Sequence, residues 1–391
     1  MNPREYLRRR GPGVLPPALV VLAILAAAVL PPVAPVRGST SPVVRVGVLL
    51  ALEAIAIAAE SSIEVGDPVA QAVTALPAGT YEFRPSPRGI ETSTNRFGPV
   101  LRLRATTGWL QAGPRRYRGT IELRRTPEGR LTAINELDLE EYLYGVLRME
   151  IDPRWPPEAL KALAVTARTL ALQSLGRFAA EGYDLRATTD SQVYGGINAE
   201  DPRTTAAVDA TRGMIMTHMG RPIFAAHHSD SGGATESSEF VWGQPYPYLR
   251  GVPDPYGQAA PTREWISRID LPTLESRLAR AGRPLSGVSG VTVTAISPSG
   301  RALDVRITGV GTVLDLRATD LRAILGVTFL RSTLLTVRLT GDEVPTVEFQ
   351  GRGYGHGVGL PQWSARDQAL LGRNYQQILT FYYQGIQFAN R

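Results

Sequence analysis

The chain of 391 residues contains no cysteine, one lysine (Lys161) and only four histidines. Without cysteine it cannot form disulfide bonds, a thiolate zinc site or a cysteine nucleophile. The histidines show no HExxH spacing, so we expect them to have structural or substrate-contacting roles and predict no bound metal. The sequence also has no GxxxxGK[ST] phosphate loop, RNA-recognition motif, zinc finger or basic recognition helix. It therefore gives no support for nucleic-acid binding.

Positive charge is carried almost entirely by arginine, and the formal net charge is +6. A net positive charge favours acidic partners such as anionic wall polymers or lipid headgroups. The remaining composition, 43% hydrophobic and 20% charged, is typical of a globular protein, and the length is enough for two or more packed units.

The first 40 residues have the pattern of an export signal. Several arginines, beginning at Arg4, precede an uninterrupted apolar run from Ala18 to Leu30, and small residues follow it. That run is shorter than the roughly 20 residues needed to cross a bilayer, although a count from Val14 to Val36 is long enough. We therefore predict an exported, extracytoplasmic protein in which residues 1–40 form a signal peptide or membrane anchor.

Short segments between residues 43 and 125 alternate apolar and polar side chains and are separated by glycine and proline. Alternation of this kind, as in LRLRA at 101–105 and TIELRR at 120–125, is typical of half-buried strands. The pattern predicts a β-rich N-terminal region, residues 41–134, which carries no obvious chemistry.

The segment from Asn135 to Leu175 predicts two helices joined by an acidic turn. Apolar residues recur at helical spacing after a candidate N-cap, Asp138, and Pro157 suits the first turn of the second helix. Prolines between the two helices end the first helix at Glu150, beside Trp155. A carboxyl group near an indole and apolar helices is poorly solvated, so we expect a raised pKa, which suits a general acid. The alternative is a glutamate that simply faces solvent at a helix end.

Three further segments carry polar and glycine-rich patterns. DSQVYGG at 190–196 offers a glutamine and a tyrosine for sugar binding, although a plain glycine turn explains it equally well. HHSDSGGATESSEFVWG at 227–243 combines hydroxyl groups with glycines that let the backbone approach a ligand. Its adjacent histidines point to opposite faces of a strand, so at most one faces Glu150. GRGYGHGVGLPQW at 351–363 is rich enough in glycine to predict a shaped loop.

Together with NELDLEEYLYGV, MEID and PPEALKALAVTARTLAL in the two-helix segment, these motifs resemble, in the same order, those of the SpoIID/LytB family of bacterial cell-wall proteins. The resemblance covers most of the chain from Val46 onward and implies that Glu150 aligns with the family's catalytic glutamate. It also implies that the last glycine loop lines the catalytic cleft, with His356 and Gln362 pointing in. Some relatives hold a metal near the HHSDSGG segment through a cysteine, which this chain lacks. The family usually continues the last motif as SQxGA, where this chain has Pro361 and Ser364.

We predict an α+β fold with a β-rich N-terminal region, a helical catalytic core with glycine-rich loops, and a mixed C-terminal region. Beyond the first 134 residues, the predicted divisions are 135–260 for the core, 261–345 for an α/β insertion, and 346–391 for the glycine-rich loop and terminal helices that complete the core. Outside the two-helix segment we expect helices at 202–213, 271–281, 320–325, 362–371 and 375–383, and a hairpin over 214–229.

The resemblance implies a peptidoglycan lytic transglycosylase of cell-wall remodelling or sporulation. Glu150 would protonate the oxygen that links N-acetylmuramic acid to N-acetylglucosamine and then take the proton of the muramic C6 hydroxyl, which gives a 1,6-anhydro product without a cofactor. One alternative is a non-catalytic, glycan-binding enhancer of a cell-wall amidase. Another is a hydrolase that uses Asp152 or Asp190 as a second carboxylate.

The expected partners are peptidoglycan glycan strands and a cell-wall amidase, with membrane attachment through the N-terminal segment. The residues expected to contact the glycan share polar, aromatic or glycine character and lie in the three motifs after Glu150. They are Gln192, Tyr194, His228, Ser229, Ser231, Gly232, Gly233, Thr235, Trp242, Tyr354, His356 and Gln362.

Overall fold

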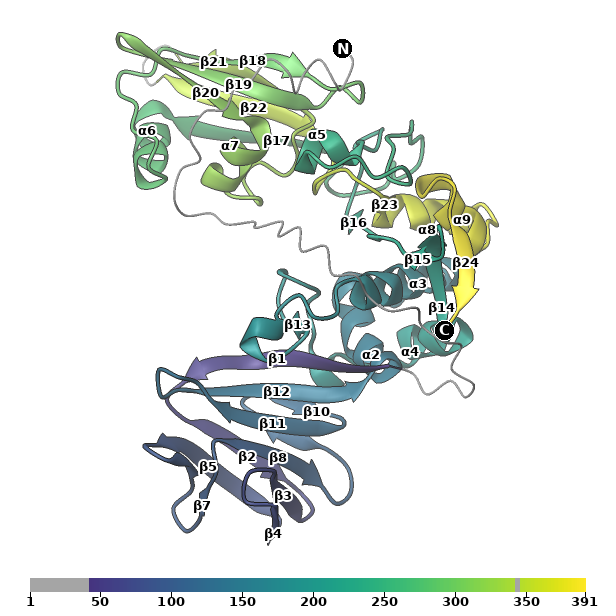
Figure 1. Ribbon diagram of the computed structural model, residues 1–391. Coiled ribbons are helices and arrows are strands. Elements are labelled where there is room, and N and C mark those ends of the chain that lie inside the picture. Colours follow the sequence, from purple (N-terminus) through teal and green to yellow (C-terminus); the bar gives the residue numbers. More distant parts are fainter. Residues whose placement is uncertain (1–41, 342–344) are drawn as a thin grey trace.

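The structure, a computed structural model, describes residues 42–341 and 345–391 and has the predicted α+β class (Figure 1). The predicted signal peptide or anchor lies outside the described residues. Within the described part of the chain, no helix is long and apolar enough to cross a membrane. The strands of residues 43–138 lie at one end of the molecule, those of residues 264–352 lie at the other end, and helices lie between them (Figure 1).

Two sheets form the N-terminal region and bury one shared core. The predicted alternation is confirmed, for example by buried Leu101 and Leu103 beside exposed Arg102 and Arg104. The seven-stranded sheet has the order β13-β1-β12-β11-β8-β3-β4, and the six-stranded sheet has the order β10-β9-β2-β5-β6-β7. The strands are β1 (Val43–Leu52), β2 (Ile55–Ala59), β3 (Ile63–Asp67), β4 (Ala72–Leu76), β5 (Gly79–Ser86), β6 (Gly89–Glu91), β7 (Arg96–Phe97), β8 (Val100–Ala105), β9 (Leu110–Ala112), β10 (Arg115–Tyr117), β11 (Thr120–Arg125), β12 (Leu131–Asp138) and β13 (Leu185–Arg186).

The two helices of the central segment form as predicted. Asp138 caps the first helix by accepting a hydrogen bond from the Glu140 amide, and Glu150 is the last helical residue. The second helix begins at Pro157 and ends at Gln173, so Leu175 lies beyond it. The helices of this central part are α2 (Leu139–Glu150), α3 (Pro157–Gln173), α4 (Pro202–Ala210), α5 (Ser238–Trp242), α8 (Gln362–Leu370) and α9 (Tyr375–Tyr382), with 3₁₀ turns η1 (Ala179–Glu181) and η2 (Gly196–Ala199).

A buried ion pair joins the central helices. The Arg168 guanidinium on α3 donates from Nε and Nη2 to the two carboxylate oxygens of Glu140 on α2, at 2.8 and 2.6 Å, and both side chains are at most 2% exposed. Arg168 also donates to the carbonyls of Val208, at the end of α4, and Met214. One side chain therefore fixes α2 relative to α3 and α4.

The predicted hairpin over 214–229 is only partly correct. Strand β14 (Met214–His218) pairs with the very short β15 (Arg221–Pro222), while its other neighbour is β24 (Gln387–Asn390) at the end of the chain. The residues after β15 leave that sheet, and β16 (His227–His228) pairs in parallel with β23 (Leu360–Pro361). Because β24, the other neighbour of β14, lies about 170 residues downstream, local alternation could not reveal that pairing.

Residues 264–352 enclose a second hydrophobic core, which includes Trp265 and Phe349. One predicted boundary, 134/135, falls inside strand β12. At the boundary 345/346 no strand is cut, but β22, which begins at residue 346, pairs with β17 and β21 of the preceding region. The domain divisions otherwise stay a prediction. The elements of the second core are β17 (Glu264–Asp270), α6 (Leu271–Arg280), β18 (Gly290–Ile296), β19 (Ala302–Gly309), β20 (Thr312–Arg317), α7 (Ala318–Leu325), β21 (Leu335–Thr340) and β22 (Thr346–Arg352).

We expect Arg168→Met to lower the free energy of unfolding by about 3–5 kcal/mol, because it leaves the Glu140 carboxylate buried without its partner. Urea denaturation monitored by circular dichroism measures this loss. The matched control is Arg154→Met, whose ion pair with Asp152 is exposed and should contribute little to stability. Equal losses in the two variants would contradict the role given to the buried pair.

Candidate active site

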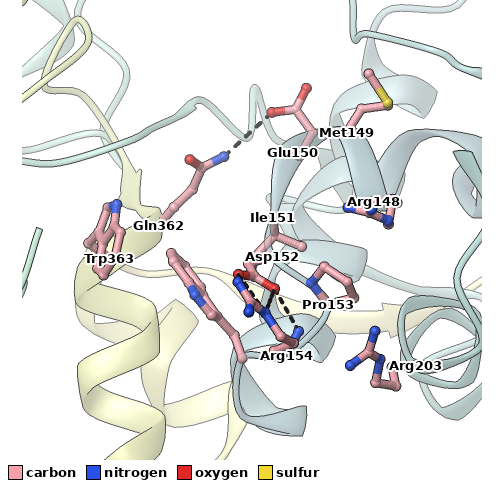
Figure 2. Close-up of a pocket in the computed structure, with 11 residues that line it drawn as sticks. Arg148, Met149, Glu150, Ile151, Asp152, Pro153, Arg154, Arg203, Gln362 and Trp363 are labelled. Carbon is pink, nitrogen blue, oxygen red and sulfur yellow. Dashed lines mark hydrogen bonds and ion pairs between the residues drawn. The ribbon is translucent and has the colours of Figure 1, made fainter. Parts of the chain in front are cut away.

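Glu150 lines two hollows in the surface. The first, about 670 Å³ and called here the histidine-side hollow, is lined by His227, His228 and His356 together with Trp242. The second, about 560 Å³ and called the tryptophan-side hollow, is lined by residues 148–155 with Gln362 and Trp363 (Figure 2). The carboxyl group at the end of α2 thus borders open space on two sides.

Each hollow supplies one hydrogen-bond donor to the same carboxylate oxygen. His227 Nε2 lies 3.3 Å and Gln362 Nε2 lies 3.4 Å from Oε2 of Glu150. Figure 2 shows the Gln362 amide pointing toward this carboxylate. The Glu150 side chain is 19% exposed, so it is shielded and yet reachable from solvent.

The expectation of a raised Glu150 pKa is wrong for this geometry. Burial does raise the pKa, but the hydrogen bond and charge of His227, the Val193 amide and Gln362 together outweigh burial, and the pKa of Glu150 lies below its ordinary value. Burial lowers the pKa of His227, but Glu150 outweighs that effect and raises it. The pair is therefore an anion beside a cation, with the shared proton on His227.

His356 positions His227 through hydrogen bonds at both ring nitrogens. Its Nδ1 accepts from the Val358 amide and its Nε2 donates to the His227 carbonyl, each at 3.0 Å. Burial and the neighbouring His227 charge lower the pKa of His356 to about 3, so the ring is neutral. The ring lines the histidine-side hollow, but its nitrogens are already committed to the backbone.

The GRGYGHGVGLPQW motif is a shaped loop, as predicted, once β22 ends at Arg352. Gly355 has φ +119° and a Cβ atom there would lie 2.6 Å from the His228 side chain, while a Cβ atom on Gly359 (φ +74°) would lie 2.0 Å from the Ala226 carbonyl. Only glycine lets the loop run this close to the chain that carries His227 and His228. The repeated glycines therefore bring His356 and Gln362 to the site.

Three of the residues predicted to contact glycan in the first two motifs line the histidine-side hollow: Gln192, His228 and Trp242. His228, however, is 5% exposed and its Nδ1 donates to the Val358 carbonyl. The histidine that reaches Glu150 is His227, which confirms that only one of the adjacent pair can do so.

The remaining residues predicted from these motifs do not line either hollow. Tyr194 is buried, and its hydroxyl donates to Asn135 at 2.8 Å. The buried Ser231 presents its carbonyl to Arg301 of the second core at 2.6 Å. These contacts give the segments a structural role, because the polar groups are already satisfied inside the protein.

The rest of the SDSGGAT segment packs in the same way. Gly232 and Gly233 lie against Arg352, Thr235 is buried against Val252, and Tyr354 pairs its backbone with Asp230. Ser229 accepts the Trp363 amide through its carbonyl, so it supports α8 from outside the hollows. The residues of this segment that were expected to contact the glycan therefore line neither hollow. The motif instead anchors the loop that carries His356.

Two groups at the site were not predicted to act there: His227 and Trp363. The sequence shows that His227 and His228 face opposite ways, but not which of them faces inward, because the strand has only two residues and its partner is distant. Trp363 follows Gln362 at the start of α8 and resembles an ordinary packing residue in the sequence.

Some relatives hold a metal near the HHSDSGG segment, but the residues of this chain at that place do not suit a metal site. Across residues 42–341 and 345–391, no group of three or more histidine, aspartate or glutamate side chains could hold a metal ion. Both nitrogens of His356 are engaged, and His227 pairs with Glu150. We therefore derive no chemical step through a metal.

A family model described as Stage II sporulation protein matches residues 127–218, and a second, described as a domain of unknown function, matches residues 257–359. Stage II sporulation protein D of Bacillus subtilis is 30% identical over 273 residues, which cover 66% of this chain and 76% of that protein. This chain belongs to the stage II sporulation protein D family. Membership places it among sporulation-related and cell-wall-related proteins, as the motifs had indicated.

Two other relatives extend the comparison. An uncharacterized protein of Brachyspira hyodysenteriae is 33% identical over 261 residues, 66% of this chain and 69% of that protein. A Bacillus subtilis protein named amidase enhancer is 28% identical over 291 residues, which cover 62% of this chain and 39% of that protein. Of these relatives, the amidase enhancer is the one whose name refers to an activity.

We expect His227→Gln to raise the pKa of Glu150, because the variant removes the adjacent positive charge. A ¹³C-NMR titration of the Glu150 carboxyl measures the shift, and His218→Gln, on β14, is the matched control. The wild-type pair should stabilise the fold most between the ordinary pKa values of 4.5 and 6.5. The Glu150 part is lost as pH falls through its lowered pKa, and the His227 part is lost as pH rises through its raised pKa. An unchanged titration in His227→Gln would refute the ion pair.

Proposed function

We propose that this protein is an exported peptidoglycan lytic transglycosylase that cleaves the bond between N-acetylmuramic acid and N-acetylglucosamine and forms a 1,6-anhydro end. The observation that carries the proposal is the position of Glu150, a shielded carboxyl group bordered by two hollows and held by one donor from each. A glycan strand that passes along the hollows would bring a glycosidic oxygen to this carboxyl group.

The reaction needs the proton to begin on Glu150, and His227 is its source. A saccharide that covers the pair removes water, and a drier environment favours a neutral glutamic acid and a neutral imidazole over two charges. Glu150 then donates the proton to the glycosidic oxygen as the bond from that oxygen to C1 breaks. The resulting carboxylate accepts the proton of the C6 hydroxyl while the C6 oxygen bonds to C1. No water is consumed, and Glu150 ends the cycle protonated.

A hydrolase would need a second carboxylate to activate water. Of the two aspartates considered for this role, Asp152 accepts from the Arg154 guanidinium at 2.6 Å, and Asp190 pairs with Arg186 at 3.2 Å. Because each is neutralised by its own arginine, neither is placed as a free base for water at Glu150. This favours the internal C6 hydroxyl as the nucleophile.

The second candidate function is a non-catalytic, glycan-binding enhancer of a cell-wall amidase. The name of the Bacillus subtilis amidase enhancer supports it, since that protein shares 28% identity with this chain. The same hollows would then bind a glycan without breaking it, and an amidase would be the protein partner. Mass spectrometry of purified glycan after incubation separates the functions: an anhydro end, a reducing end, or an intact strand. For either function, we propose that the protein acts on the wall side of the membrane.

We expect Glu150→Gln to abolish release of anhydro-muropeptides, a loss of about 10²-fold or more, because the amide keeps the shape of the side chain but cannot transfer the proton. Liquid chromatography with mass spectrometry measures the products. Glu158→Gln is the matched control: Glu158 pairs with Lys161 at 2.7 Å and accepts the Tyr375 amide, and glutamine keeps an acceptor oxygen. Full activity of folded Glu150→Gln, or loss of activity in folded Glu158→Gln, would refute the assignment.

We expect the activity to survive exhaustive dialysis against EDTA, because the described histidines and carboxylates form no metal-ligand group. Product release before and after dialysis is the measurement, with added zinc as the second arm. Inactivation by EDTA and recovery with zinc would instead make His228 a ligand, since its Nε2 is buried and has no hydrogen-bond partner among the described residues.

A further inference from the structure

We propose that the tryptophan-side hollow is a second saccharide-binding subsite. The protein then holds glycan on both sides of Glu150 and cuts within strands rather than at their ends. This inference rests on the proposed function, and it assigns the sugar contacts on that side to Trp155 and Trp363. Neither residue is among the glycan contacts that the sequence motifs predict.

The first argument is the position of the carboxyl group. Glu150 lines both hollows, and its Oε2 atom receives His227 from one side and Gln362 from the other. A cleft that stopped at the carboxyl group would accept only the terminus of a strand. A hollow on each side has room for sugars before and after the bond that breaks, which is the geometry of cleavage within a strand.

The second argument is the pair of indole rings. Trp155 and Trp363 line the tryptophan-side hollow with ring centroids 4.8 Å apart, and both are only half-buried. Aromatic faces suit the apolar faces of sugar rings. Two large aromatic side chains beside a candidate catalytic carboxyl group therefore form a sugar platform in a hollow that Trp242 does not line.

The platform is held rigidly. The Trp363 amide donates to the Ser229 carbonyl at 3.1 Å, two residues after His227, and the Arg366 guanidinium lies 5.4 Å from the Trp363 ring centroid. The Trp155 amide donates to the Asp152 carbonyl at 3.0 Å, between prolines that restrict the turn. Because the backbone of both residues is hydrogen-bonded and the two rings pack against each other, binding a sugar costs little additional side-chain entropy.

The charges around this hollow favour a saccharide over a polyanion. Three arginines line it. Arg154 and Arg203 are each neutralised by an aspartate, Asp152 at 2.6 Å and Asp201 at 2.8 Å, while Arg148 has no ion pair within the described part of the chain. Glu150 adds a negative charge at its edge. A phosphate-rich polymer would find few uncompensated cations here, whereas the hydroxyl and amide groups of a glycan find both donors and acceptors.

The hollow also continues away from Glu150. A third hollow of about 420 Å³ shares Trp155, Arg154 and Arg203 with it and adds apolar side chains such as Leu160 and Ala206. The continuous surface therefore extends past the indole pair, which gives space for more than one sugar on this side.

Glycan strands of defined length, labelled at both ends, test the inference. We expect the wild-type protein to release internal fragments that carry neither label, and Trp363→Ala to lose about tenfold or more of its rate on long strands. Trp363→Phe should restore most of that rate because it keeps an aromatic face. Trp109→Ala is the matched control, since Trp109 also has an arginine over its ring, 4.9 Å from Arg116, but lies in the N-terminal region.

Strand binding by Glu150→Gln proteins, measured by calorimetry with and without Trp363→Ala, gives a readout that does not depend on activity. Weaker binding by the double variant supports the subsite even if the wild-type protein cleaves nothing. Absence of cleavage by the wild-type protein would overturn only the proposed function. Two results would overturn the inference and leave the proposed function standing. One is the release of labelled end fragments alone, and the other is unchanged binding and cleavage in folded Trp363→Ala.

Discussion

The buried pair between Arg168 and Glu140 is the constraint on which the rest of the central region depends. Two charges removed from water are stable only with well-aligned partners, so the pair tolerates very little movement of α2 against α3. Glu150 is the last residue of α2, and its position relative to the chain that carries His227 follows from that alignment. An interaction far from solvent thus sets the geometry of a carboxyl group at the surface.

Contacts from the second core stabilise the other half of the site. Arg301, itself fully buried, donates to the carbonyls of Ser231 and Ala234, and a Cβ atom on Gly357 would lie 2.5 Å from its guanidinium carbon. The glycine loop that carries His356 therefore lies between Arg301 and β16. The second core supports the glycine loop through this arginine, and Arg322 and Val327 of the same region line the histidine-side hollow.

Local patterns predicted much of the fold. The alternation in β8, the Asp138 cap and the proline-rich turn after Glu150 are local signals, and each is confirmed. Strand β11 forms as expected, but its polar Glu122 is buried between Ile121 and Leu123, so its burial does not alternate. Short strands such as β7 and β10 were missed because two or three residues carry no detectable period. Strand β24 was missed for a different reason, since its partner β14 lies far away in the sequence.

In the site, too, local patterns predict some features, while others depend on residues that are distant in the sequence. Proline and helix spacing place Glu150 at a helix end, but the sign of its pKa shift depends on His227, which is 77 residues away and whose facing direction no local pattern reveals. Tyr194 has the composition of a sugar contact, yet a single hydrogen bond to Asn135 makes it part of the interior. Residue type suggests chemistry, whereas burial decides whether that chemistry is available to a ligand.

The hydrogen bond between Gln362 and Glu150 spans 212 positions of the chain. Contacts of such high sequence separation form late, because the intervening chain must first be brought together. A growing polypeptide that ends before Gln362 therefore lacks the Gln362 contact to Glu150, however well its N-terminal sheets have folded. The order of synthesis therefore delays completion of this contact until the segment that contains Gln362 has been made.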